Sequence, residues 1–139
     1  MQSFTIDHQP SAEAIAYINE QIQSFNIEQT GISTRSSVSL VLRDETGAII
    51  AGINGQLWGN CCELQSLWVS EKHRGSGLGK QVLELAETKV KEQGGTVLTL
   101  ASFSFQAPKF LREQGFDLVG VVQDYPSPYN KYFFRKKLA

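Results

Sequence analysis

Apolar side chains recur at the spacing of one helical turn in the first part of the chain. The recurring positions are Ala14, Ile15, Ile18 and Ile22. Ser11 precedes them and is a residue type that caps helix N-termini. The pattern predicts a helix from Ser11 to about Phe25, after a short strand over Ser3–Asp7. The polar segment Asn26–Thr34 predicts a loop or a weak second helical turn.

The next third of the chain alternates polar and apolar residues, as strands with one buried face do. Ser37–Arg43 alternates in this way, Asp44–Gly47 has the composition of a hairpin turn, and Ala48–Gln56 returns as the partner strand. A second turn at Gly59-Asn60 leads into the apolar segment Cys61–Val69. Three consecutive antiparallel strands are therefore predicted.

The second half of the chain alternates between helix and strand patterns. A helix from about Ser76 to Gln93 carries its apolar residues on one face and ends at Gly94-Gly95. The buried-looking strand Thr96–Phe103 follows, so strand, helix and strand form a parallel crossover unit. The remaining predicted elements are a short helix over Ala107–Gln114 and two strands over Phe116–Asp124 and Lys131–Leu138. The elements predict one mixed α/β sheet with helices on both faces.

Composition narrows the functional classes. The 139 residues are 41% apolar and carry a net charge of −1. We expect one folded domain over residues 1–139, without nucleic acid or a membrane as partner. There is no signal-peptide pattern and no apolar run near 18 residues, so a cytoplasmic location is expected. The adjacent Cys61 and Cys62 should point to opposite faces of a strand as buried, reduced thiols, and the two histidines form no ligand-spaced cluster, so no metal is expected.

The segment between the strand Cys61–Val69 and the following helix has the composition of an anion site. It contains Arg74, Gly75, Gly77 and Gly79. Glycine allows the backbone to turn tightly and approach a ligand, and a helix N-terminus offers unpaired N–H groups and positive partial charge. Arg74–Lys80 therefore predicts a cradle for a phosphate or pyrophosphate, rather than a glycine-rich turn without a ligand.

Two common nucleotide motifs do not fit this segment. The dinucleotide fingerprint needs its third glycine one residue later than Gly79. The P-loop needs four residues between its glycines, whereas three separate Gly75 from Gly79, and Gln81 stands where a magnesium-binding hydroxyl belongs.

The spacing that fits is Arg-x-x-Gly-x-Gly, given by Arg74, Gly77 and Gly79, with the apolar Leu67-Trp68-Val69 before it and Ala107 to Phe116 downstream. In these residues the chain resembles the GNAT superfamily of N-acetyltransferases, and in particular a group of small bacterial single-domain members. The resemblance implies the acyl-CoA N-acyltransferase fold, with a mixed, mostly antiparallel sheet of six or seven strands. It also implies acetyl-CoA as co-substrate, an amine as acceptor, and a monomer or homodimer.

The resemblance also implies roles for individual residues. A β-bulge in the strand ending at Val69 should free backbone groups for pantetheine at Leu67 and Val69, with the Leu67 N–H facing the thioester carbonyl. The pyrophosphate contacts fall on Arg74, Gly75, Gly77, Leu78, Gly79 and Lys80. Glu63 matches the position of a general base, although a solvated, edge-facing glutamate is an equal alternative. Gln65, on the same face, is placed to hold a bridging water.

A second family motif is only partly present. Ala107, Gly115 and Phe116 match, whereas Ser104 replaces an asparagine, and Ser104 is kept as a cofactor contact. Leu111 replaces the tyrosine that often protonates the departing CoA thiolate. The substitute acids that we consider are Tyr125 and Tyr129, with Tyr132 more simply a strand residue.

Three functions remain open at this level. The first is an acetyl-CoA-dependent N-acetyltransferase that acts on a small-molecule or protein amine by direct transfer. The second is a catalytically weak CoA-binding sensor. The third, a toxin-type acetyltransferase of aminoacyl-tRNA, is disfavoured by the net charge of −1.

Overall fold

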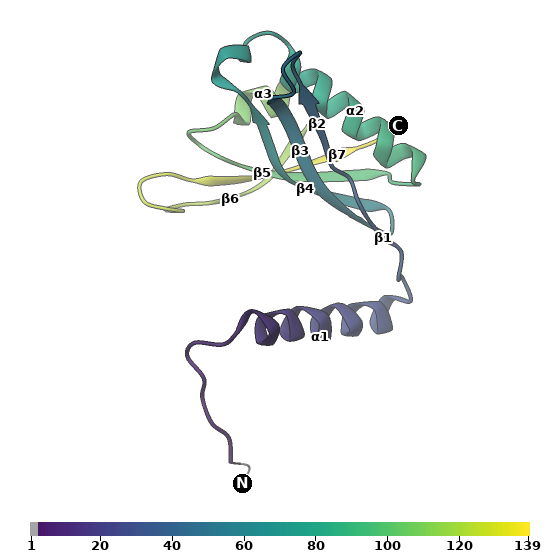
Figure 1. Ribbon diagram of the computed structural model, residues 1–139, viewed down its shortest axis with the longest axis vertical. Helices are drawn as coiled ribbons and strands as arrows, with labels where there is room; N and C mark the ends of the chain where they lie inside the picture. Colours follow the sequence, from purple (N-terminus) through teal and green to yellow (C-terminus); the bar gives the residue numbers. More distant parts are fainter. Residues whose placement is uncertain (1–2) are drawn as a thin grey trace. The chain divides into compact units, whose positions relative to one another are not determined.

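The computed structural model describes residues 3–139, and the chain divides into two compact units, residues 1–33 and 34–139 (Figure 1). The first unit contains one helix, α1 (Ala12–Thr30). Ser11 caps it as predicted, because its side chain accepts a hydrogen bond from the Ala14 N–H. The prediction of a single domain over the whole chain stays a prediction.

Two predictions for the first unit are wrong. Residues 3–7 form no strand in the described chain, since alternation favours an extended backbone but a strand also requires pairing. The helix continues to Thr30, so its predicted end at about Phe25 is wrong, and of the two alternatives for Asn26–Thr34 the helical one holds for residues 26–30. Its end is set by Gly31, whose φ of 71° lies in the left-handed region and whose N–H donates to the Ile27 carbonyl at 2.7 Å.

The second unit is built on a seven-stranded sheet in the order β1-β3-β4-β5-β7-β6, with β2 also paired to β3 (Figure 1). Among the strands of residues 3–139, only β4 and β5 pair in parallel, so the predicted mixed, mostly antiparallel fold is confirmed. The strands are β1 (Arg35–Ser37), β2 (Leu40–Arg43), β3 (Ile49–Trp58), β4 (Cys61–Val69), β5 (Val97–Phe103), β6 (Asp117–Val122) and β7 (Lys131–Lys137). The helices are the 3₁₀ turn η1 (Glu71–His73), α2 (Leu78–Glu92) and α3 (Pro108–Glu113).

The structure corrects two boundaries. The single strand predicted over Ser37–Arg43 is two short strands, β1 and β2, which both pair with β3 and are separated at Val38 and Ser39. Helix α2 begins at Leu78 rather than Ser76, because Gly77 has a φ of 86°, which a right-handed helix cannot include.

One face of the sheet carries the hydrophobic core. Helix α2 contributes Val82, Leu83, Ala86 and Val90, and α3 contributes Leu111, to the same cluster of buried residues. Strand residues such as Leu64, Leu98 and Phe134 complete this cluster. Because side chains alternate along a strand, Glu63 on β4 and Thr99 and Phe103 on β5 point to the opposite face.

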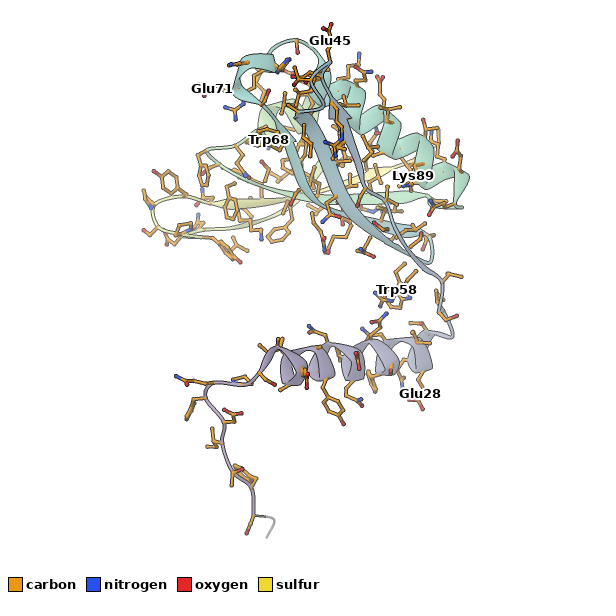
Figure 2. The ribbon with its side chains drawn as sticks, in the orientation of Figure 1. Glu28, Glu45, Trp58, Trp68, Glu71 and Lys89 are labelled. Carbon is orange, nitrogen blue, oxygen red and sulfur yellow. The ribbon has the colours of Figure 1, made fainter. Side chains whose placement is uncertain are left out.

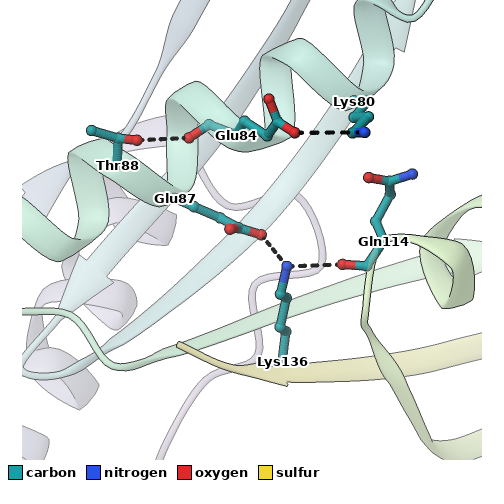
Figure 3. Close-up of polar contacts among 6 residues, drawn as sticks. All are labelled: Lys80, Glu84, Glu87, Thr88, Gln114 and Lys136. Atoms are coloured by element: carbon teal, nitrogen blue, oxygen red, sulfur yellow. Dashed lines mark hydrogen bonds and ion pairs between the residues drawn. The ribbon is translucent and has the colours of Figure 1, made fainter. Parts of the chain in front are cut away.

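Lys136 joins three elements of the second unit. Its Nζ lies 2.6 Å from Oε1 of Glu87 on α2 and 2.8 Å from the backbone oxygen of Gln114, just after α3 (Figure 3). In residues 3–139, none of the helices combines the length and apolar character needed to cross a bilayer.

Candidate active site

Strands β4 and β5 stop pairing halfway along their length. Their parallel ladder runs from Cys61↔Val97 to Leu64↔Leu100, whereas β4 continues to Val69 and β5 to Phe103. The bulge expected in β4 is present, since the register with β3 shifts between Asn54 and Gly55 and leaves Gln65 as the extra residue. A bulge bends its strand and interrupts a ladder. The backbone of β4 past Leu64 therefore has no ladder pairing on its β5 side, and we call this unpaired edge of β4 the opening.

A short loop connects this opening to the start of α2. Ser70 Oγ lies 2.6 Å from His73 Nδ1, and the Ser76 hydroxyl donates to the His73 carbonyl. Arg74 donates from Nε to the Val69 carbonyl at 3.1 Å. This bond uses one of the five guanidinium donors and leaves the terminal nitrogens for a phosphate.

The glycines of the loop have two different physical roles. Gly75 and Gly77 have φ values of 78° and 86°, and a Cβ built on either would meet no heavy atom within 4 Å. These two positions give the open, left-handed backbone that an anion cradle needs. A Cβ on Gly79 would instead lie 3.2 Å from the Phe110 ring, so Gly79 allows α2 and α3 to pack closely. A side chain at position 79 would therefore meet Phe110, and the pyrophosphate contact at Gly79, which its backbone N–H would make, stays a prediction.

Leu78 and Lys80, the remaining predicted cradle residues, offer different chemical groups to a phosphate: a backbone N–H and a side-chain ammonium. Leu78 packs against the core, so its backbone N–H is the group available at the helix N-terminus. The Lys80 ammonium lies 4.0 Å from Glu84 Oε1, with both side chains exposed (Figure 3). Such a surface pair is weak and leaves Lys80 free to reorient toward a phosphate.

A row of polar side chains crosses β4, β3 and the residue just before β2, on the face opposite the core helices. Gln65 Nε2 donates to Glu63 Oε1 at 3.4 Å, and Asn54 Nδ2 donates to Gln65 Oε1 at 3.3 Å. Ser39 Oγ donates to Asn54 Oδ1 at 2.7 Å. Glu63 and Gln65 were predicted, but Asn54 and Ser39 were missed, because only strand register brings them beside Gln65.

The two cysteines are free thiols, as expected. Cys62 is buried, and burial raises the pKa of its thiol to about 11. Cys61 is half-buried rather than buried, and desolvation again raises its pKa. Both groups hold their protons at neutral pH, and since the thiolate is the nucleophilic form, neither is equipped to carry an acyl group.

Residues 4–116 match the sequence model of the family described as "Acetyltransferase (GNAT) family". The chain belongs to this family. A blasticidin-S acetyltransferase of Streptomyces morookaense is 30% identical over 95 residues, 68% of this chain and 70% of that protein. A crystal structure of an acetyltransferase from Bacillus cereus superposes with a TM-score of 0.85 and 32% identity, covering 96% of this chain and 98% of that chain.

A more distant acetyltransferase structure was solved with acetyl coenzyme A. It is provisionally assigned as a streptothricin acetyltransferase of Bacillus anthracis, with a TM-score of 0.64 and 20% identity over 73% of this chain and 62% of that chain. At this identity the likeness shows the fold.

The two residues that depart from the second family motif, and the two tyrosines considered as substitute acids, lie in different environments. Leu111 is 2% exposed and belongs to the core, so a tyrosine there would have to displace packed side chains. Tyr125 and Tyr129 are about half exposed in the loop between β6 and β7. Ser104 joins the end of β5 to this loop: its Oγ accepts the Asn130 N–H at 3.1 Å, and its own N–H donates to the Asn130 carbonyl at 2.9 Å.

Proposed function

We propose that this GNAT protein transfers the acetyl group of acetyl-CoA to the amine of a small molecule. The observation that carries the proposal is the continuity between the opening beside β4 and the cradle at the start of α2. Only residues 70–77 separate them, and Arg74 is bonded to Val69, the last residue of β4. A ligand with a thioester at one end and a pyrophosphate at the other suits this arrangement, and a GNAT relative was crystallised with acetyl coenzyme A.

Backbone groups would bind most of the co-substrate. The N–H groups at the start of α2 and the Arg74 guanidinium would hold the pyrophosphate, with Lys80 nearby. The β4 backbone at Leu67 and Val69 would hold the pantetheine as an added strand does, since the ladder with β5 ends before these residues. The Leu67 N–H would then polarise the thioester carbonyl.

Glu63 would accept the proton of the attacking amine. An ammonium has no lone pair, so the proton must leave before or during attack on the carbonyl carbon. Gln65 donates to the Glu63 carboxylate and is placed to orient a water between this carboxylate and the amine. Collapse of the tetrahedral adduct breaks the C–S bond and releases CoA thiolate, which needs no obligatory acid because a thiol pKa lies near 8.5.

The relatives indicate which acceptors to test first. One is named for blasticidin S and another, provisionally, for streptothricin, so small amine antibiotics head the panel, followed by simple alkylamines and peptides with a free N-terminus. The competing function is a CoA-binding sensor, which is favoured by the buried Leu111 at the position of the usual acid.

An amine-dependent thiol-release assay on the full chain separates the two functions. For an acetyltransferase, free thiol appears only when acetyl-CoA and a competent amine are both present, and mass spectrometry finds the acetylated amine. A sensor would bind CoA in calorimetry and release no thiol with any amine of the panel. That second result would contradict the proposal.

A further inference from the structure

Four aromatic side chains gather where β5 ends and the β6–β7 loop returns: Phe103, Phe105, Tyr125 and Tyr129. We call them the aromatic cluster. The Phe103 and Phe105 rings stack with centroids 5.4 Å apart, and Phe105 meets Tyr129 edge-on at 5.0 Å. Phe103 also contacts Tyr125 at 5.7 Å. Phe105 is 60% exposed and Tyr129 is 45% exposed, so much of their ring surface still faces solvent.

Hydrogen bonds hold the cluster in place. The Phe103 N–H donates to Gln106 Oε1 at 2.7 Å, which fixes the turn that carries Phe105. The Tyr125 N–H donates to the Tyr129 carbonyl at 2.8 Å, which closes the loop between them. Together with the Ser104–Asn130 pair, these bonds set the ring positions before any ligand arrives, and preorganisation of this kind lowers the cost of binding.

Phe103, the member of the aromatic cluster on β5, lies on the sheet face of the proposed base and at about the level of the proposed thioester. Thr99 pairs with Glu63, and Phe103 follows Thr99 by four residues, so Glu63 and Phe103 point to the same face. Leu64 pairs with Leu100, which puts Leu67 on one side of the opening and Phe103 on the other at about the same level. A ligand that contacts the rings would thus have its amine near the reacting carbonyl.

An aromatic cluster can recognise a cation or a flat ring, and Lys131 decides between them. The Lys131 ammonium lies 4.8 Å from the Tyr125 ring centroid and 5.4 Å from those of Phe103 and Phe133. A charge of the protein itself thus occupies a cation–π position of Phe103 and Tyr125, two of the four rings of the aromatic cluster, and Phe103 stacks directly on Phe105. A second cation would meet like charge, whereas an uncharged flat ring can stack on the exposed rings.

We propose that the aromatic cluster selects amine acceptors that carry a flat, uncharged ring a few bonds from the amine. This inference rests on the proposed acetyl transfer and adds the acceptor class to it. Phe105 and Tyr129 are positioning residues here, since they contact the distant part of the acceptor and take no part in bond making.

Two amines with the same carbon skeleton test the inference. For 2-phenylethylamine the ring is flat, whereas for 2-cyclohexylethylamine it is puckered, and both have a primary alkylamine. We expect kcat/KM to favour the flat ring by about 2- to 12-fold, the range of aromatic pair energies, and spermidine to be the poorest acceptor. A ratio near one, or a preference for spermidine, would overturn the inference.

Variants assign the preference to the cluster. Phe105→Leu and Tyr129→Leu should bring the ratio close to one, while Tyr129→Phe should keep it because the ring remains. Trp58→Leu is the matched control, because it also removes an aromatic ring. Trp58 contacts Arg35 at the last residue of β3, whereas Trp68 pairs near the other end of that strand, and Figure 2 labels both tryptophans. An unchanged ratio in Phe105→Leu, with native-like melting, would remove the cluster from acceptor recognition.

A binding measurement separates failure of this inference from failure of the proposed function. Ligand-observed NMR with 2-phenylethylamine and CoA reports ring binding without turnover. One outcome is that no amine is acetylated, but 2-phenylethylamine gives a binding signal that is lost in Phe105→Leu. In that case the aromatic cluster binds a flat ring, and the proposed acetyl transfer is wrong. If 2-phenylethylamine gives no binding signal with the native protein, the aromatic cluster does not bind a flat ring, whatever the turnover with other amines.

Discussion

At the scale of single residues, the neighbours of Glu63 support the proposal that its carboxylate accepts the amine proton. The side chain is exposed, yet it accepts a hydrogen bond from Gln65, which is in turn bonded to Asn54. An amide in that position can orient a water toward the carboxylate, which suits proton transfer over a short distance. A surface glutamate without such neighbours would be free to rotate in solvent.

Glu63→Gln should lower kcat/KM by about 10²-fold at pH 7, because the amide cannot accept the amine proton. The defect should shrink as the pH approaches the amine pKa, since more acceptor then arrives neutral. Calorimetric CoA affinity should stay native, as Glu63 is outside the cradle. Glu45→Gln, in the β2–β3 turn (Figure 2), is the matched control and should leave activity unchanged. Full activity of Glu63→Gln at pH 7 would place the base elsewhere.

At the scale of elements, the structures that depend on residues close together in sequence were predicted best, and those that depend on strand pairing were predicted worst. The turns Asp44–Gly47 and Gly59-Asn60, and the strand Cys61–Val69, were predicted closely because turn residues and apolar runs act locally. The break between β1 and β2 was not predicted, since it depends on how each strand pairs with β3.

The candidate site shows the same division. The proposed Arg74–Lys80 cradle is contiguous in sequence, so it could be proposed from the sequence and the family resemblance, and it stays a prediction. The polar row and the aromatic cluster join side chains from several elements, so strand register had to be known first. Gly79 is an example: its spacing fits the family motif, but only the packing of α2 and α3 shows that a Cβ at this position would lie 3.2 Å from the Phe110 ring.

Gly47 in the β2–β3 hairpin provides a control for a substitution at Gly77 in the proposed cradle. Gly77 and Gly47 have φ values of 86° and 87°, and a Cβ on either meets open space. Alanine at each position should therefore cost a similar backbone strain, about 1 kcal/mol of unfolding free energy. Only at Gly77 would the methyl group enter the proposed pyrophosphate site.

We expect Gly77→Ala to weaken CoA binding in calorimetry by about tenfold or more, or 1.4 kcal/mol, and Gly47→Ala to bind normally. In the native protein, CoA at one hundred times its dissociation constant should add about 2.7 kcal/mol to the unfolding free energy. Equal CoA affinities for the two variants would rule out the cradle as the pyrophosphate site.

At the scale of the whole molecule, Lys136 couples parts of the chain that are far apart in sequence. Its ammonium contacts Glu87, 49 positions away, and the Gln114 carbonyl, 22 positions away. Figure 3 draws the Lys136–Glu87 pair and the Lys80–Glu84 pair of α2. The Lys136 and Glu87 side chains are 24% and 16% exposed, whereas those of Lys80 and Glu84 are 61% and 64% exposed. The two pairs differ mainly in burial and in distance, which makes them a natural comparison.

Lys136→Met should lower the unfolding free energy by about 1–3 kcal/mol, because the largely buried Glu87 carboxylate and the Gln114 carbonyl each lose a donor. Lys80→Met should change it by less than about 1 kcal/mol, since an exposed pair is screened by water and salt. Urea titration without ligand measures both. Combining Lys136→Met with Glu87→Gln should cost less than the sum of the single changes, as coupled partners do. A Lys136→Met loss no larger than that of Lys80→Met would show that β7, α2 and α3 are held together by apolar packing alone.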